Sequence, residues 1–253
     1  MFESMRPIPS LLSAAVILTG LVLVATLAIR AVPRAVVRTG VSTQGGNVVN
    51  GVVNKVTPTG PARRRQAALR RIAESGTYVG SMLAAQDSVL RRWPERMNRP
   101  LRIYLPRGRE VPGWSDGMDN AVQAAFYRWE RVPDVPMRFE FVRDTAGAEV
   151  RVRWIREFSG QRTGQADIVW NRDGWIVRGT LTLAVRSPGG HGLSEDAVHT
   201  VALHEIGHLL GLGHSNDPGD VMHATTDIRD LTVRDRNSAR LLYALEPGNL
   251  KGR

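Results

Sequence analysis

Cysteine is absent from all 253 residues of the sequence. Its absence excludes disulfide bonds, zinc sites closed by thiolate ligands and thiol nucleophiles. The sequence also lacks a G-x-S-x-G segment, the signature of a serine nucleophile on a sharp strand-to-helix turn. No internal repeat is visible, which argues against a solenoid or propeller architecture. If the protein is an enzyme, its chemistry therefore has to come from another set of residues.

Acidic residues are scarce in the first part of the chain and are in slight excess afterwards. Residues 1–60 carry five basic and one acidic side chains, residues 61–109 carry twelve and three, and residues 110–253 carry seventeen and twenty. The formal net charge of +10 therefore describes an N-terminal arm and not the C-terminal part. For this reason we expect no nucleic-acid partner.

The only long run that is both uncharged and largely apolar is Leu11–Ile29, which is long enough to cross a bilayer. Arg30 and Pro33 interrupt the sites at which a signal peptide would be cleaved, which favours an uncleaved membrane anchor. A cleaved signal segment is the alternative. Arg34 and Arg38 add positive charge after the run, which by itself would keep the C-terminal side cytoplasmic, although long domains translocate despite such charge.

Three of the six histidines lie within eleven residues, in the segment VALHEIGHLLGLGH. His204 and His208 are one helical turn apart, so both imidazoles can reach a single ion. Gly211 can take the left-handed conformation that ends a helix and so let the chain return with His214. Three neutral imidazoles with one open position suit a catalytic Zn²⁺. Glu205 lies beside this group, where a general base would be placed.

An ordinary buried helix that is rich in histidine, with Gly211 as its C-cap, is the alternative interpretation of this segment. The pattern H-E-x-x-H-x-x-G-x-x-H would arise by chance with a probability on the order of 10⁻⁵ at this composition. A bare H-E-x-x-H would be far weaker evidence. The extended pattern therefore favours a metal site.

This pattern resembles the metzincin clan of zinc endopeptidases and, within it, the matrixin family (peptidase M10), especially its bacterial members. The resemblance extends over roughly Arg99–Leu245. The segment HEIGHLLGLGHS continues into Ser215 as matrixins do, and Met222 in GDVMH occupies the position of the Met-turn. Asp235, in LTVRDRNSARLLYAL, matches an acidic residue that ties the closing helix of matrixins to that turn.

The resemblance implies a zinc endopeptidase that hydrolyses peptide bonds in protein or peptide substrates. His204, His208 and His214 would be the metal ligands, and Glu205 would be the general base that acts on a metal-activated water. Met222 would form an apolar floor below the zinc. No covalent intermediate is expected in this mechanism.

Three departures from the family pattern modify these expectations. Ala224 and Thr226 stand where matrixins usually carry proline and tyrosine, so we expect a differently shaped pocket for the residue after the scissile bond. The structural zinc and calcium loop of the animal enzymes has no counterpart in the stretch 161–185, which predicts a single zinc ion. A latency switch based on a cysteine is excluded because the chain has none.

The periodicity of the C-terminal part predicts an α+β domain with a mixed five-stranded sheet and three main helices. The resemblance implies that this domain is of the metzincin type. We expect strands at 99–106, 137–142, 148–155, 164–170 and 175–185. The predicted helices cover 116–132, a zinc helix capped by Ser194, and a closing helix within 231–245. By resemblance, the strand at 164–170 is an antiparallel edge strand that lines the cleft, where an extended peptide would add as a further strand.

The chain is thus divided into five predicted segments. They are a membrane anchor or signal segment (1–32), a linker (33–60), a basic arm (61–97), the peptidase domain (98–246) and a tail (247–253). The arm is predicted to consist of two helices, over 61–76 and 77–97. The arginines of the arm form either a solvated surface or a contact with anionic lipid.

We expect a membrane-anchored protein with an extracytoplasmic catalytic domain, or a secreted one, because the family resemblance argues for export. The alternative function is a non-catalytic membrane-associated module whose basic arm binds anionic lipid or polymer. The carboxylate of Glu205 beside the metal ligands favours the enzyme, since a scaffold does not need it.

Overall fold

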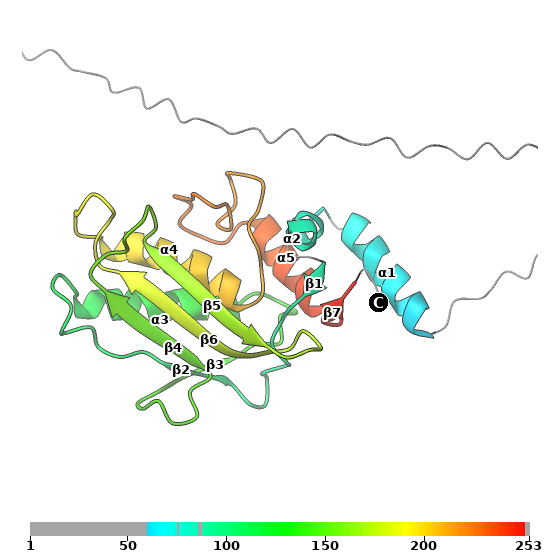
Figure 1. Cartoon of the computed structure of the whole chain (residues 1–253), viewed down its shortest axis with the longest axis horizontal. Helices are drawn as coiled ribbons and strands as arrows, with labels where there is room; N and C mark the ends of the chain where they lie inside the picture. Colours follow the sequence, from blue (N-terminus) through cyan, green and yellow to red (C-terminus); the bar gives the residue numbers. More distant parts are fainter. Residues whose placement is uncertain (1–59, 75, 86–87, 251–253) are drawn as a thin grey trace, which may run out of the picture. The chain divides into compact units, whose positions relative to one another are not determined.

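The structure, a computed structural model, describes residues 60–74, 76–85 and 88–250 (Figure 1). The predicted apolar segment Leu11–Ile29 and the linker at 33–60, except for its last residue, lie outside the described residues. None of the helices in the described part is both long enough and apolar enough to span a bilayer. The anchor therefore stays a prediction.

A mixed five-stranded sheet in the order β3-β2-β4-β6-β5 forms the centre of the domain, which confirms the prediction (Figure 1). Strands β2 (Leu101–Tyr104), β3 (Phe139–Val142), β4 (Val150–Ile155) and β6 (Ile176–Ala184) run parallel to one another. Strand β5 (Gly164–Trp170) is antiparallel to β6 and lies at one edge of the sheet. It has the place and direction expected of a cleft-lining strand.

Two long helices, α3 (Asp116–Glu130) and α4 (Glu195–Leu209), contact each other and cover one face of the sheet (Figure 1). Helix α4 also contacts β5 and β6. The Ser194 hydroxyl accepts a hydrogen bond from the backbone N–H of Ala197 at 3.2 Å and so caps α4, as predicted. The closing helix α5 (Val233–Tyr243) follows after a long loop, and these are the three predicted main helices.

Large apolar side chains fix α4 between the sheet and α3. Trp129 of α3 is fully buried, and its indole N–H donates to the carbonyl oxygen of Leu203 at 2.9 Å. On the other side of α4, Leu209 packs over Gly179 of β6, where a Cβ would lie 2.8 Å from a leucine methyl group. A helix that is buried on several sides in this way gives its side chains fixed positions.

The first helix of the predicted arm, α1 (Gly60–Glu74), is present and has exposed arginines. The predicted second helix over 77–97 is wrong in its extent. Only α2 (Val79–Ala85) is helical; the chain then takes a left-handed conformation at Ser88, with φ of 58°, and continues as an extended strand. In this extended conformation, Leu90 and Trp93 are fully buried.

The extended part of this segment belongs to the core of the domain. Strand β1 (Val89–Leu90) pairs antiparallel with β7 (Gly248–Asn249), and Trp93 is fully buried with its indole N–H donating to the carbonyl oxygen of Leu209 at 2.8 Å. Arg92, which we assigned to the basic surface, is 6% exposed and donates to the carbonyl oxygen of Leu245 at 2.9 Å. Residues before the predicted domain start therefore pack against the C-terminal end of α4.

Candidate metal centre

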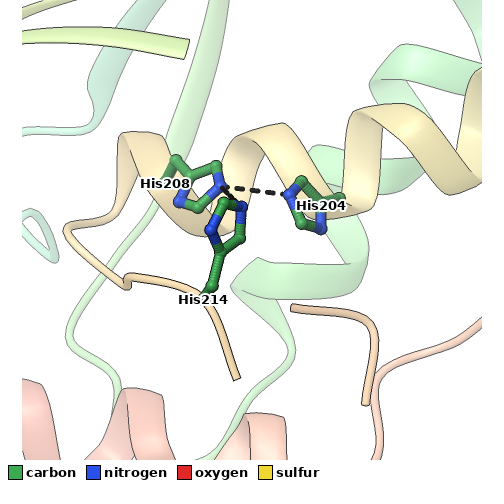
Figure 2. Close-up of side chains that lie close together, drawn as sticks. All are labelled: His204, His208 and His214. Carbon is green, nitrogen blue, oxygen red and sulfur yellow. Dashed lines mark hydrogen bonds between the residues drawn. The ribbon is translucent and has the colours of Figure 1, made fainter. Parts of the chain in front are cut away.

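The three histidines of the extended motif converge on one point (Figure 2). His204 and His208 project from the same face of α4, and His214 reaches them from the loop that follows the helix. The Nε2 atom of His208 is 3.0 Å from that of His204 and 3.2 Å from that of His214. All three ligand atoms lie within 4.8 Å of one another.

The hydrogen bonds of the two helical histidines define which ring nitrogen faces the centre. His204 Nδ1 lies 2.8 Å from the carbonyl oxygen of Val221, and His208 Nδ1 lies 2.8 Å from that of Leu212. Because a carbonyl oxygen only accepts, each Nδ1 carries the proton and donates it. Each Nε2 then presents a lone pair to the centre of the triad, as a metal ligand requires.

Electrostatics also favours a cation at this point. Burial lowers the pKa of His208 to about 3, and burial also lowers the pKa values of His204 and His214, so the three rings are neutral at physiological pH. Converging lone pairs repel one another unless a cation lies between them. Two nitrogens bound at about 2.0–2.1 Å to a tetrahedral zinc ion are about 3.3 Å apart, close to the separations found here. The residues therefore fit a zinc ion.

Gly211 lets the chain turn back toward the metal centre. It follows the last turn of α4 with φ of +103°, and its N–H donates to the carbonyl oxygen of His208 at 2.9 Å. A Cβ at this position would lie 2.1 Å from the carbonyl oxygen of Arg91. Both the backbone conformation and the close neighbour require glycine here.

Glu205 lies next to the triad and faces the open cleft. Its side chain is close to Gly164 of β5, where a Cβ would be 2.6 Å from the Glu205 Cγ atom. The backbone N–H of Ala166 donates to its carboxyl group. Burial raises the pKa of Glu205 to about 7, against a weaker opposing effect of this hydrogen bond. Burial therefore makes this carboxyl group easier to protonate than an ordinary glutamate.

The cleft beside Glu205 contains a cavity of about 420 Å³. His204 and Glu205 form one wall, Gly164 lies on β5, and Ala224 and Thr226 form the wall that follows Met222. The two positions at which the chain departs from the family pattern therefore do line the cavity beside the metal centre.

Met222 is fully buried below the metal-binding turn of α4. A Cβ at Gly207 of α4 would lie 2.3 Å from the sulfur of Met222, so this glycine lets the turn approach the helix closely. The carbonyl oxygen of Met222 accepts from the N–H of Ser215 at 2.8 Å. The side chain of Met222 thus packs against α4 between the positions of His204 and His208.

The side chain of Asp235 in α5 binds the backbone of the turn that contains Met222. It is fully buried and accepts hydrogen bonds from the N–H groups of Val221 at 3.0 Å and Met222 at 3.4 Å. It also accepts from Thr232 at the start of α5, in a capping box, and from the hydroxyl of Tyr78 at 3.2 Å. Tyr78 was not predicted as part of the site, because it precedes Asp235 by 157 residues and lies outside the motif.

Asp220 is a second buried carboxylate that the sequence analysis missed. It accepts hydrogen bonds from the hydroxyl of Ser215 at 2.5 Å, from Arg234 at 2.9 Å and from Thr232 at 2.9 Å. Arg234 also donates to the side chain of Asn216 at 2.8 Å. These hydrogen bonds connect the loop that follows His214 to helix α5. In the sequence, Asp220 follows a Pro-Gly pair and resembles an ordinary turn residue.

Comparison with known proteins agrees with this geometry. Residues 112–244 match the family model of matrixins, peptidase family M10. The chain is 32% identical to Metalloendoproteinase 1-MMP of Arabidopsis thaliana over 155 residues, which cover 53% of this chain and 40% of that protein. It is 28% identical to Metalloendoproteinase 1 of Glycine max over 176 residues, which cover 62% of this chain and 54% of that protein.

A viral relative, the Probable matrix metalloproteinase 095L of Invertebrate iridescent virus 3, is 27% identical over 52% of this chain and 39% of its own length. The matched part thus spans about half, or less, of the length of these curated relatives. The family model, in contrast, matches more than half of this chain, from before α3 to the end of α5. The chain therefore belongs to the matrixin family of metallopeptidases.

Proposed function

We propose that the protein is a zinc-dependent endopeptidase with one catalytic ion. His204, His208 and His214 hold the metal, and Glu205 is the general base. The observation that carries this proposal is the convergence of three Nε2 lone pairs beside a buried carboxyl group that faces an open cleft. When bound, zinc would supply Lewis acidity, which lowers the pKa of a water molecule and polarises the scissile carbonyl group.

Glu205 handles the proton in this mechanism. Its carboxylate accepts the proton of the attacking water and then delivers it to the nitrogen of the leaving amine. A pKa near 7 allows both transfers at neutral pH, because neither protonation state is strongly favoured. The reaction needs no covalent intermediate, in agreement with the absence of cysteine.

The substrate would bind to β5 as an additional strand. Strand β5 forms an edge of the five-stranded sheet, so one side of its backbone can pair with an extended peptide. This edge passes Glu205 at Gly164 and Ala166, which brings the peptide backbone to the metal centre. The cavity lined by Ala224 and Thr226 would receive a side chain next to the cleaved bond.

The alternative is a non-catalytic membrane-associated module that binds anionic lipid or polymer through its basic arm and keeps the zinc fold as a scaffold. The exposed arginines of α1 are compatible with both functions and therefore do not favour this one. A scaffold gains nothing from a buried carboxyl group beside the ligands, since burial of this group raises its pKa and disfavours its charged form.

Placement at a membrane is a separate part of the proposal. The run Leu11–Ile29 would anchor the chain or be removed as a signal segment, with the catalytic domain extracytoplasmic or secreted. The exposed arginines 63, 64, 70 and 71 favour contact between α1 and anionic lipid. Protection of the domain from protease in intact cells would contradict the extracytoplasmic location. Equal binding of the chain to neutral and anionic vesicles would contradict the lipid contact.

Metal analysis combined with a peptide-cleavage assay tests the enzymatic proposal. We expect one zinc ion per chain, loss of cleavage when a chelator removes it, and recovery when zinc is returned. Cleavage that persists in the metal-free protein would contradict the proposal.

A further inference from the structure

A second cavity, of about 270 Å³, lies beside the metal ligands and further along the cleft. We call it the Arg91 cavity; its lining consists of Arg91, Ala166, Ile168, His208, Gly211 and Leu212. The first cavity adjoins Gly164 and His204, and this one adjoins Ile168 and His208, so the two follow each other along both β5 and α4. A peptide bound along β5 would pass both.

Arg91 reaches this cavity from the extended segment that precedes the predicted peptidase domain. The backbone there is held firmly, because Arg92 exchanges hydrogen bonds with Gly174 and Ile176 at 3.2 and 2.9 Å. On the other side, the carbonyl oxygen of Arg91 fits against Gly211. The Arg91 side chain lies over the exposed ring of Trp170, with its Cζ atom 4.0 Å from the ring centroid. The guanidinium group therefore has a defined place at the wall of the cleft.

Among the described residues that line the Arg91 cavity, Arg91 is the only one with an arginine, lysine or acidic side chain. The others are His208, glycine and apolar residues. A guanidinium group stacked on an aromatic ring still directs its N–H donors outward in its own plane. Carboxylates match this planar donor set best among protein side chains.

The direction of β5 decides which part of the substrate meets Arg91. Antiparallel pairing is the more stable arrangement per residue for an added strand. Strand β5 runs from Gly164, beside Glu205, to Trp170, beside Arg91. An antiparallel peptide therefore passes Trp170 with the residues that precede the cleaved bond. At about 3.3 Å per residue, the Arg91 cavity lies about two to four residues before that bond.

We propose that the Arg91 cavity binds an aspartate or glutamate side chain of the substrate, two to four residues on the amino-terminal side of the cleaved bond. Arg91 is then a specificity-determining residue contributed from outside the predicted peptidase domain. This inference rests on the proposed endopeptidase function and adds a substrate preference to it.

The test uses the zinc-loaded full chain and one cleavable peptide sequence. Glutamate, glutamine or lysine is placed in turn at each of the four positions before the cleaved bond, and kcat/KM is measured with mass-spectrometric identification of the products. We expect glutamate to exceed glutamine about five- to tenfold at one or two of these positions. The ratio should decrease at high salt, because it depends on charge.

Substitutions of Arg91 assign the preference to this side chain. Arg91→Gln should bring the ratio of glutamate to glutamine close to one, Arg91→Lys should keep part of it, and Arg91→Glu should favour lysine instead. The matched control is Arg172→Gln, which removes an exposed arginine of the β5–β6 turn and should keep the parental ratio. Zinc content and thermal unfolding show whether each variant is folded.

Two results would overturn this inference: equal kcat/KM for glutamate and glutamine at all four positions in the parent, or an undiminished preference in Arg91→Gln. If Arg91→Gln does not fold, a ratio in the parent that is independent of salt overturns it equally. Cleavage without a glutamate preference removes this inference alone. Failure of the zinc-loaded parent to cleave any peptide removes the proposed function as well.

Discussion

Tyr78 and Asp235 join the segment before the peptidase domain to the turn that supports the metal centre, by a hydrogen bond of 3.2 Å between two buried side chains. Asp235 in turn accepts from the N–H groups of Val221 and Met222. The carbonyl oxygen of Val221 also accepts from the Nδ1 atom of His204. Three successive hydrogen bonds thus connect Tyr78 of the N-terminal segment to His204, one of the proposed metal ligands.

Removing the Tyr78 hydroxyl should therefore destabilise the protein. Tyr78→Phe keeps the packing of the ring and leaves Asp235 with one donor fewer, which should lower the free energy of unfolding by about 1 kcal/mol or more. Urea unfolding measures this change. Tyr127→Phe is the control, since Tyr127 is exposed on α3. Equal stability of Tyr78→Phe and the parent would show that this hydrogen bond contributes nothing.

The network around Asp220 should influence metal binding through the loop that carries His214. Asp220→Asn keeps the size of the side chain but removes the negative charge that faces Arg234. It also replaces one of the two carboxylate oxygens by an NH2 group, which cannot accept hydrogen bonds from Ser215 and Arg234 as the Asp220 Oδ2 atom does. Loss of a partner that orients a ligand commonly weakens metal binding about 10- to 100-fold, and we expect a change at the lower end. Zinc titration against a competing chelator measures it. Asp173→Asn, an exposed change in the β5–β6 turn, should bind zinc like the parent.

Gly211 and Gly190 allow a matched comparison of backbone conformation and space. Both have positive φ values, +103° and +77°, but a Cβ at Gly211 meets the carbonyl oxygen of Arg91 at 2.1 Å, whereas a Cβ at Gly190 has no atom within 4 Å. Gly190→Ala should therefore cost only the strain of the left-handed conformation, about 1 kcal/mol. Gly211→Ala should cost clearly more and should also weaken zinc binding. Equal unfolding free energies for both variants would contradict this account.

The metal affinity should depend less on pH than that of ordinary imidazoles. Burial holds the pKa of His208 near 3 and lowers those of His204 and His214, so the rings stay neutral and able to bind metal below their usual pKa. Three imidazoles with a pKa of about 6.5 would lose affinity by a factor of roughly 600 between pH 7 and pH 5.5. We expect a distinctly smaller loss in a competition titration. A loss of that size or larger would show that protons compete freely for the ligands.

Local patterns predicted the parts of the site that depend on short-range geometry. His204 and His208 are one turn apart whatever the surroundings of the helix, and Gly211 marks its end. The alternation of apolar residues likewise predicted the five strands, because one face of each strand is covered by helices. Each of these features is determined by residues that are close to one another in the sequence.

The residues that sequence analysis missed act over long distances. Tyr78 and Asp235 are 157 residues apart, and no local pattern pairs a tyrosine with a particular carboxylate. The segment from Ser88 to Trp93 was predicted as part of a helix over 77–97. In the structure it forms an extended strand because β7, near the C-terminal end of the chain, supplies its hydrogen-bonding partner.

The most direct test of the account is the activity and zinc content of Glu205→Ala. This change leaves His204, His208 and His214 in place, so zinc content and thermal stability should remain close to those of the parent, while His204→Ala should lose metal and activity together. Peptide cleavage by Glu205→Ala should fall by at least about 10²–10⁴-fold, because a positioned general base is removed. A Glu205→Ala protein that keeps its zinc and also cleaves at the parental rate would contradict the proposed mechanism.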